Sequence, residues 1–256
     1  MKGFTAFFIK ELREMIRTKR MMIILGIFLV VGILSPAMAK LTPELMKMAA
    51  EDFTEMGVTV GEIKVTALDS WAQFTKNMPT ALIVVIIMMS GIYTSEYARG
   101  TLVPLITKGL SRQAVVLSKL AVMLITWSAG AWLCYGVTYF YTEWYWDNKT
   151  AKAPVFGAFC IWLFGVLMIS CIVFFSSLAS SGAQVMLGTG AVYIAMTMAG
   201  LYSKAKEYLP TRLLDSNPLY RGELLPGDYT KAAVISAAVS AVLILAALPI
   251  TKRRMI

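Results

Sequence analysis

The sequence contains no histidine and three cysteines, each of which lies inside a long apolar run: Cys134, Cys160 and Cys171. Histidine and paired cysteines supply most zinc and iron ligands in proteins, so this composition argues against an intramembrane metal site. An odd number of thiols in apolar surroundings also argues against a disulfide framework and is typical of small packing residues. We therefore expect the chain to bind no metal.

Charged residues are scarce as well. They make up 15% of the 256 residues, whereas apolar residues make up 58%, and a typical soluble domain has about 25% charged residues. A helix needs about 20 apolar residues to cross a hydrocarbon core about 30 Å thick. Six runs approach this length, which predicts an all-α polytopic membrane protein with one transmembrane domain over residues 1–256. The predicted spans are residues 21–39, 77–94, 113–142, 155–178, 184–202 and 231–250.

Sequence motifs for nucleotide binding and hydrolysis are missing. No G-x-x-x-x-G-K-[ST] motif occurs, so the chain has no P-loop to hold nucleotide phosphates. G-x-S-x-G and H-E-x-x-H are also absent, and no polar stretch is long enough for a soluble catalytic domain. We expect that the chain is not an enzyme and carries no cofactor of its own.

The predicted spans contain almost no ionisable residues. Proton- and ion-coupled carriers usually need such groups near the membrane midplane. A pathway lined by Met, Ala, Ser, Thr and aromatic side chains suits an amphipathic or apolar cargo better than a small ion, although these residues also fill membrane cores.

The net charge of +9 is distributed unequally between the two predicted sides of the membrane. Residues 1–20, 96–119 and 252–254 hold thirteen of the 24 Lys and Arg residues but three of the 15 acidic residues. Because segments rich in Lys and Arg stay in the cytoplasm, we expect both termini to be cytoplasmic. The excess of basic residues is then explained by the orientation of the chain in the bilayer and does not indicate binding to nucleic acid.

Two polar segments lie on the predicted cytoplasmic side. Residues 3–20 place apolar side chains at helical spacing and charged ones on the remaining arc, which predicts an interfacial helix with its basic face toward anionic headgroups. A signal peptide is the alternative, but the apolar run that follows is longer than a typical signal h-region. Residues 95–112 are predicted to form a polar cytoplasmic loop with a short amphipathic helix. We expect the membrane-spanning part of the chain to be built around this loop.

The two longest segments on the other side are residues 40–76 and 203–230. In the first, Thr42, Pro43 and Glu44 match the start of a short interfacial helix, with a capping residue, a proline and an acid. In the second, three prolines interrupt many apolar residues, which predicts a re-entrant loop that caps a pathway.

Aromatic residues crowd the outer end of the third span and predict a belt at headgroup level, with a ligand-binding aromatic box as the alternative. Asn148, with Lys149 and Thr150, formally fits a glycosylation acceptor.

The fifth span carries small residues at four-residue spacing, Ala191, Ala195 and Ala199, and Gly188 and Gly190 lie just before them. This spacing lets helix backbones approach closely, so we expect this face to pack on another helix, and a subunit interface is one such place. A polar pathway is the alternative, and it rests on Thr189, Tyr193 and Thr197.

Two segments of the sequence resemble ABC-2-type transporter permeases. FIKELREMIRTKR, followed by a span, is similar to the amphipathic elbow helix with a lysine–glutamate–leucine sequence that begins those proteins. The interior loop resembles their glutamate…glycine–threonine–leucine…serine–arginine…lysine pattern. The residues that carry this match are Glu96, Arg99, Gly100, Thr101, Leu102, Ser111, Arg112 and Lys119. Gly109-Leu110 departs from the family, because many members have proline before the serine–arginine pair.

The resemblance implies a half-transporter with a type V exporter-like architecture. Two permease chains, identical or paralogous, would pair in the bilayer, and each would dock on a cytoplasmic ABC ATPase that holds ATP and Mg. The loop after the second span would be the coupling helix. The implied coupling residues are Glu96, Arg99, Gly100, Thr101, Leu102, Leu105, Arg112 and Lys119. The implied elbow-helix residues are Lys10, Glu11, Leu12 and Arg17, and the candidate dimer or pathway residues are Gly188, Ala191, Ala195 and Ala199.

These expectations describe the permease subunit of an ATP-driven exporter in the cell membrane of a bacterium. The expected substrate is an amphipathic or hydrophobic peptide, such as a toxin, an antimicrobial peptide or a phenol-soluble modulin, with drugs and lipids ranked lower. An ATPase-independent secondary carrier or channel is the alternative.

Overall fold

The computed structural model describes residues 2–54, 64–202 and 205–254. All regular secondary-structure elements in these residues are helices, which are joined by short turns and loops. Six helical segments are long and apolar enough to cross a membrane, which confirms the predicted all-α fold with six spans. These segments are α2 (Arg20–Thr54), α3 (Ala67–Met89) with α4 (Gly91–Ala98), α6 (Arg112–Tyr145), α7 (Pro154–Leu178), α8 (Gly182–Ala199) and α10 (Thr230–Arg254).

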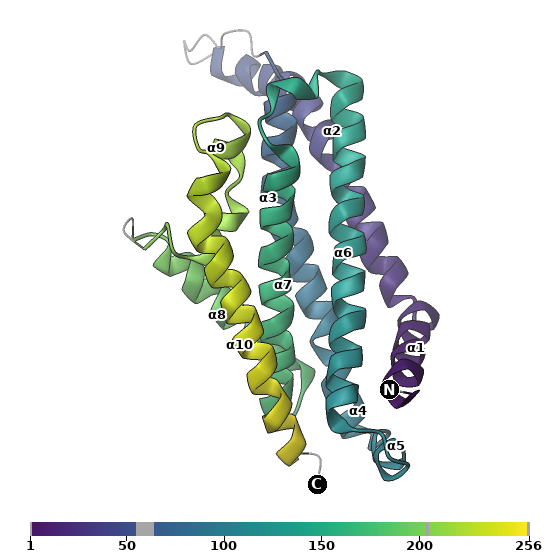
Figure 1. Cartoon of the computed structure of the whole chain (residues 1–256). Coiled ribbons are helices and arrows are strands. Elements are labelled where there is room, and N and C mark those ends of the chain that lie inside the picture. Colours follow the sequence, from purple (N-terminus) through teal and green to yellow (C-terminus); the bar gives the residue numbers. More distant parts are fainter. Residues whose placement is uncertain (1, 55–63, 203–204, 255–256) are drawn as a thin grey trace.

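Short elements lie at the two ends of this bundle (Figure 1). The end that holds the described parts of both chain termini also holds α1 (Lys2–Arg17), α4 and α5 (Val103–Thr107). The opposite end holds α9 (Asn217–Tyr220). The remaining short elements are η1 (Asn148–Thr150), η2 (Pro210–Leu214) and η3 (Pro226–Tyr229). We call the first of these ends the terminal end and the second the α9 end.

The core lies between α3, α6 and α7. In these three spans 56%, 67% and 72% of the most apolar window is buried within the chain, whereas the values for α2, α8 and α10 are 28%, 11% and 17%. The centre is tightly packed around Trp127, whose Nε1 donates to the carbonyl of Trp162 at 2.9 Å. A Cβ on Gly165 would lie 2.0 Å from the Trp127 ring, so glycine is required there.

Hydrogen bonds between polar side chains and neighbouring helices join α2, α3 and α6. Asn77 Nδ2 donates to Ser35 Oγ at 3.2 Å, and Thr138 Oγ1 donates to the carbonyl of Gly32 at 3.1 Å. The hydroxyls of Ser70 and Thr142 are 2.7 Å apart and buried. Such bonds satisfy polar groups away from water and hold membrane helices together.

The prediction that a short helix starts at Thr42 is wrong. α2 continues through Pro36 and Pro43 to Thr54, and Thr42 Oγ1 donates back to the carbonyl of Met38 at 2.8 Å. A proline inside a helix removes one backbone hydrogen bond and kinks the helix without always ending it. The expected outer segment 40–76 is therefore largely helical, and its residues 55–63 lie outside the described part of the chain.

α3 begins ten residues before the predicted start of the second span. Thr66 is its N-cap residue, and Asp69 Oδ2 accepts from the Thr66 backbone N–H at 2.8 Å. The polar residues before Asn77 therefore extend the helix beyond its most apolar part. At the other end of this span, the helix is interrupted at Ser90 and continues as α4 to Ala98, so helix occupies part of the predicted loop 95–112.

The described residues of the predicted loop 203–230 pack on the bundle through η2, α9 and η3. Their buried side chains include Leu213, Leu219, Tyr220 and Tyr229. The Tyr220 ring lies directly against Gly157 of α7, where a Cβ would come within 2.4 Å of the ring. We call residues 205–229 the outer cap. Residues 203 and 204 of the predicted loop lie outside the described part.

Some residues of the predicted aromatic belt face outward without contact to the core, and others pack against a buried tryptophan. Phe140 and Trp144 are exposed, as expected at headgroup level. Tyr135 and Tyr139 instead pack on the buried Trp71. Trp71 Nε1 donates to Asn148 Oδ1 at 3.0 Å, and Asn148 Nδ2 donates to the carbonyl of Tyr139 at 3.0 Å. The Asn148 amide is therefore buried and engaged, which excludes it as a glycosylation acceptor in this fold.

Candidate functional site

At the terminal end, α1 is held to the bundle by an apolar cluster and an ionic network. The apolar cluster consists of Phe7 from α1, Leu102 from the loop after α4, and Val115 from α6. All three side chains are buried, and Tyr97, Ile106 and Leu110 pack against them. The interfacial helix predicted from the first 20 residues is thus in direct contact with the interior loop.

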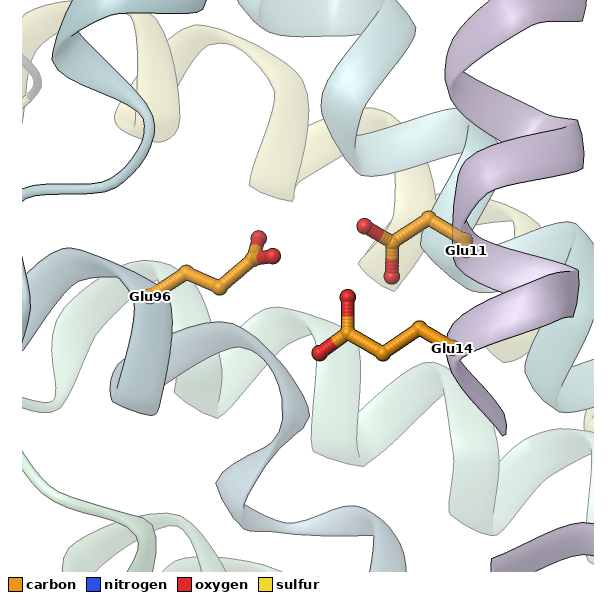
Figure 2. Close-up of side chains that lie close together, drawn as sticks. All are labelled: Glu11, Glu14 and Glu96. Carbon is orange, nitrogen blue, oxygen red and sulfur yellow. The ribbon is translucent and has the colours of Figure 1, made fainter. Parts of the chain in front are cut away.

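The ionic network joins the same three parts of the chain. Lys119 Nζ from α6 contacts Glu11 Oε2 at 2.8 Å and Glu96 Oε2 at 2.7 Å. Lys10 Nζ contacts Glu11 Oε1 at 2.8 Å, Glu14 Oε2 at 2.6 Å and also Glu96 Oε1. Figure 2 shows the three carboxylates converging, with Glu11 and Glu14 on α1 and Glu96 facing them from α4.

Burial makes part of this network energetically costly to break. The side chains of Lys119, Glu11 and Glu96 are 1%, 4% and 11% exposed, whereas those of Lys10 and Glu14 are 39% and 46% exposed. Removing one partner of a buried ion pair costs about 3–5 kcal/mol, because the remaining charge is left unpaired away from water. Lys119 and its two carboxylates are therefore the inner part of the network, and Lys10 with Glu14 forms its rim.

The rim lysine is held in its charged form. Partial burial lowers the pKa of Lys10, but hydrogen bonds and charge interactions with Glu11, Glu14 and Glu96 outweigh this effect and raise the pKa well above its usual range. The five side chains carry three negative and two positive charges, so the network has one excess negative charge.

The three carboxylates are close enough to share a cation, since one oxygen of each lies within 4.8 Å of the others. In this fold both lysine ammonium groups already occupy that role, because each of the three carboxylates is in ion-pair contact with at least one of them. The network therefore connects α1, α4 and α6 through ion pairs.

Two glycines in the left-handed region shape the loop between α4 and α6. Gly100 has φ +65° and Gly109 has φ +94°, and such values suit glycine because it lacks a Cβ. Proline cannot adopt them. Gly109 therefore ends α5 with a sharp turn, after which Ser111 Oγ caps α6 by accepting from the Ala114 backbone N–H at 3.2 Å. The residues that depart from the family pattern thus have a clear local role.

The structure separates the predicted loop residues into anchors and exposed residues. Glu96 and Lys119 are in the ionic network and Leu102 is in the apolar cluster, so Leu102 is not available to a partner. The exposed residues at the tip of the loop include Arg99, Gly100, Thr101, Val103, Leu105 and Lys108. Arg112 is the first residue of α6.

On α1, the predicted residues Lys10 and Glu11 are in the network, Leu12 packs against the main core, and Arg17 is exposed. Sequence reasoning missed Glu14 and Phe7 as site residues. Their spacing held a signal, because Glu14 follows Lys10 by four residues and Phe7 precedes Glu11 by four residues, which places them on one face.

A pocket of about 450 Å³ lies between α1 and the loop. Its α1 wall consists of Gly3, Ala6, Phe7 and Lys10, and its loop wall consists of Leu105, Lys108, Gly109 and Leu110. The lining is mostly apolar with two lysines, so it fits an apolar side chain with a neighbouring acid.

The small residues of α8 do not share one environment. A Cβ on Gly188 would lie 2.7 Å from the Phe175 ring of α7, so Gly188 is in close contact within the chain. Ala191, Ala195 and Ala199 are exposed instead. The expectation that a helix packs on these alanines is therefore not met within the described part of this chain.

These features define a multi-pass helical membrane protein in which the first helix, the loop after the second span and the start of the third span form one junction. Comparison with protein families identifies residues 5–212 as matching the ABC-2 family transporter protein. This match covers more than half of the chain, which belongs to this family. Members are membrane subunits that usually work with an ATPase subunit. Separate comparisons with curated proteins and with solved structures gave no match.

Proposed function

We propose that the chain is the permease subunit of an ATP-driven exporter and that it couples to a separate cytoplasmic ATPase at the loop between α4 and α6. The junction at the terminal end carries this proposal. Its loop exposes Val103 and Leu105 at the tip, while the base of the same loop is fixed to α1 and α6 by buried groups.

The exposed tip has the properties of a docking element. Val103 is 61% exposed and Leu105 is 37% exposed, although both are large apolar residues. Basic residues, Arg99 and Lys108, lie before and after them in the loop. A short amphipathic helix of this kind binds by placing its apolar side chains in a groove of the partner. The pocket beside Leu105 would accept a side chain from the ATPase in return.

A displacement of α5 by the ATPase would be transmitted to the membrane spans through the junction. Leu102 lies next to α5 and packs on Phe7 of α1 and Val115 of α6. Glu96, at the end of the second span, is tied to α6 by Lys119. Because these contacts are buried and their separation is costly, α1, α4 and α6 would move together when the ATPase changes shape.

The translocation pathway would lie between two copies of the chain. The core around α3, α6 and α7 is closely packed, whereas α2, α8 and α10 are mostly exposed. Ala191, Ala195 and Ala199 give α8 an exposed face of small residues, which suits close contact with a second permease. A dimer formed through these helices would enclose a pathway with apolar walls.

An amphipathic or hydrophobic peptide is the cargo that such walls fit best. α8 has no charged residue, and its exposed side chains include Leu187, Ile194 and Met198. The test is ATP hydrolysis by the reconstituted transporter with amphipathic helical peptides. Stimulation is expected, whereas no response to peptides together with stimulation by lipids or drugs would contradict the peptide assignment.

Docking itself is tested by affinity purification of the tagged chain from its native membrane in mild detergent. A P-loop ATPase should accompany the wild type and should be lost from the variant Arg99→Glu/Gly100→Pro, because proline cannot adopt φ +65°. Arg221→Glu is the matched control, since Arg221 is exposed and follows α9 at the other end of the bundle. Recovery of the wild type alone under several mild conditions would favour the carrier or channel alternative.

A further inference from the structure

We propose that the carboxyl-terminal end of α1 and its junction with α2 form a binding site for the headgroup of an anionic phospholipid. A pocket of about 540 Å³ lies at this end of α1 and is lined by Lys10, Arg13, Glu14, Arg17 and Thr18. This site shares one lining residue, Lys10, with the loop pocket at the other end of α1, and its remaining lining residues differ. The inference does not depend on the identity of the ATPase or the cargo.

The basic residues at this site differ from Lys10 in having no acidic partner among the residues that the structure describes. Arg13 and Arg17 are four residues apart, so they lie on one face of α1, and both are exposed. Lys19 and Arg20 follow at the junction. None of these four residues takes part in an ion pair with another of the described residues. Their positive charge is therefore available to an external anion.

The backbone at the junction keeps these charges at the start of a membrane span. α1 ends at Arg17 and α2 begins at Arg20, so the chain turns within two residues. Lys19 makes this turn with φ +58°, a conformation that residues other than glycine rarely adopt. Since α2 enters the hydrocarbon region from this point, the pocket lies at the level of the lipid headgroups.

The position of the pocket favours a lipid over the ATPase as its occupant. The amino-terminal half of α1 faces the loop, through Phe7 on Leu102 and Gly3 beside Leu110. The carboxyl-terminal end instead joins the membrane span, and Figure 1 shows α1 continuing into α2 away from α5. Basic clusters next to a transmembrane helix recognise anionic lipids.

The side chains also suit a phosphate group. Arginine guanidinium groups bind phosphate through two parallel hydrogen bonds, which lysine cannot do. The acidic residue in the lining, Glu14, is held by Lys10 at 2.6 Å. Its negative charge is therefore partly neutralised by the network, which reduces its repulsion of a phosphate between Arg13 and Arg17.

The test uses the full chain reconstituted into vesicles with equal amounts of phosphatidylglycerol and phosphatidylcholine and then extracted in mild detergent. Native mass spectrometry measures which lipids remain bound. The wild type should retain phosphatidylglycerol preferentially, and Arg13→Gln/Arg17→Gln should lower this preference by roughly tenfold, because each basic residue near a membrane surface contributes to anionic lipid binding.

Two matched variants make the result specific. Lys149→Gln/Lys152→Gln removes the same charge from two exposed residues between α6 and α7, away from α1, and should retain the lipid as the wild type does. Arg13→Lys/Arg17→Lys keeps the charge without the paired guanidinium bonds and should retain an intermediate amount. Circular dichroism checks that each variant keeps its helical content.

Three outcomes would overturn the proposal. The first is equal phosphatidylglycerol retention by the wild type and the Arg13→Gln/Arg17→Gln variant. The second is complete displacement of the lipid by soluble glycerol phosphate, which would assign the pocket to a free phosphate compound. The third is loss of a co-purifying ATPase from Arg13→Gln/Arg17→Gln with unchanged lipid retention, which would assign this surface to the protein partner.

Discussion

The junction at the terminal end and the outer cap are both built from segments distant in sequence, but buried ion pairs contribute to the junction, whereas the ion pairs at the cap are exposed. At the junction, Lys119 pairs with Glu11 and Glu96, residues that lie on two other helices. In the outer cap, Tyr220 packs on Gly157 and Trp71 through apolar and aromatic contact. Ion pairs depend on charge and geometry together, whereas apolar packing depends mainly on shape. Under the proposed function, the junction would transmit force from the ATPase, whereas the outer cap closes one end of the bundle.

This contrast predicts the largest effect for loss of the inner lysine. Lys119→Met leaves Glu11 and Glu96 buried without the ammonium group that they share. This change should lower the free energy of unfolding by about 3–5 kcal/mol. Thermal unfolding in mild detergent measures the change. The triple variant Lys119→Met/Glu11→Gln/Glu96→Gln removes all three charges and should recover much of the loss. If Lys119→Met unfolds at the wild-type temperature, the junction is not held together by its charges.

A smaller effect is expected in the outer cap. Gly157→Ala places a Cβ within 2.4 Å of the Tyr220 ring, and overpacking of this kind costs about 1–3 kcal/mol. Because the cap is distant from the junction, the variant should retain the ATPase on affinity purification. Gly190→Ala is the matched control, since its added Cβ meets no atom within 4 Å. Equal stability of both variants would show that Tyr220 is not tightly seated.

Removing a charge from the rim of the network should lower the stability of the fold less than removing one from its centre. Glu14→Gln removes a carboxylate that is 46% exposed, and an exposed ion pair contributes about 0–1 kcal/mol. The change also removes the excess negative charge of the network. The same unfolding measurement should give a loss below about 1 kcal/mol. A loss equal to that of Lys119→Met would mean that the rim and the centre form one cooperative unit.

The smallest effect is expected from pH near neutrality. The pKa of Lys10 is raised in the fold, so its contribution is fully present below the pKa of an unfolded lysine, about 10.4, and is lost as pH rises above that value. The stability difference between the wild type and Lys10→Met should therefore stay constant through neutral pH and shrink in strong alkali. A difference that changes near neutral pH would point to another titrating group.

The sequence predicts the spans well because the bilayer imposes a simple rule of length and apolar content. α6 and α7 begin within one residue of the positions expected from that rule. The rule fails where a helix continues beyond the apolar region, as α2 does past Lys40 and α3 does before Asn77. Thr42 and Pro43 gave a wrong helix start because the same residues occur at the start of a helix and, less often, inside one.

The site is predictable as separate residues but not as an assembly. Glu96 and Lys119 follow from the family pattern, and Lys10 and Glu11 follow from the elbow-helix pattern. Their convergence depends on how α1 packs against α6, which a single sequence does not encode locally. For the same reason, the sequence does not show that Leu102 faces inward or that Ala191 is exposed while Gly188 is covered.

Site-specific photo-crosslinking from Leu105 is the most direct test of the central claim that the loop docks an ATPase. A photoreactive residue at Leu105 should form an adduct with a P-loop ATPase in native membranes. The same residue at Leu225, which is exposed in the outer cap, should form none. An adduct at Leu225, or none at Leu105 while the ATPase co-purifies and hydrolyses ATP, would contradict the account.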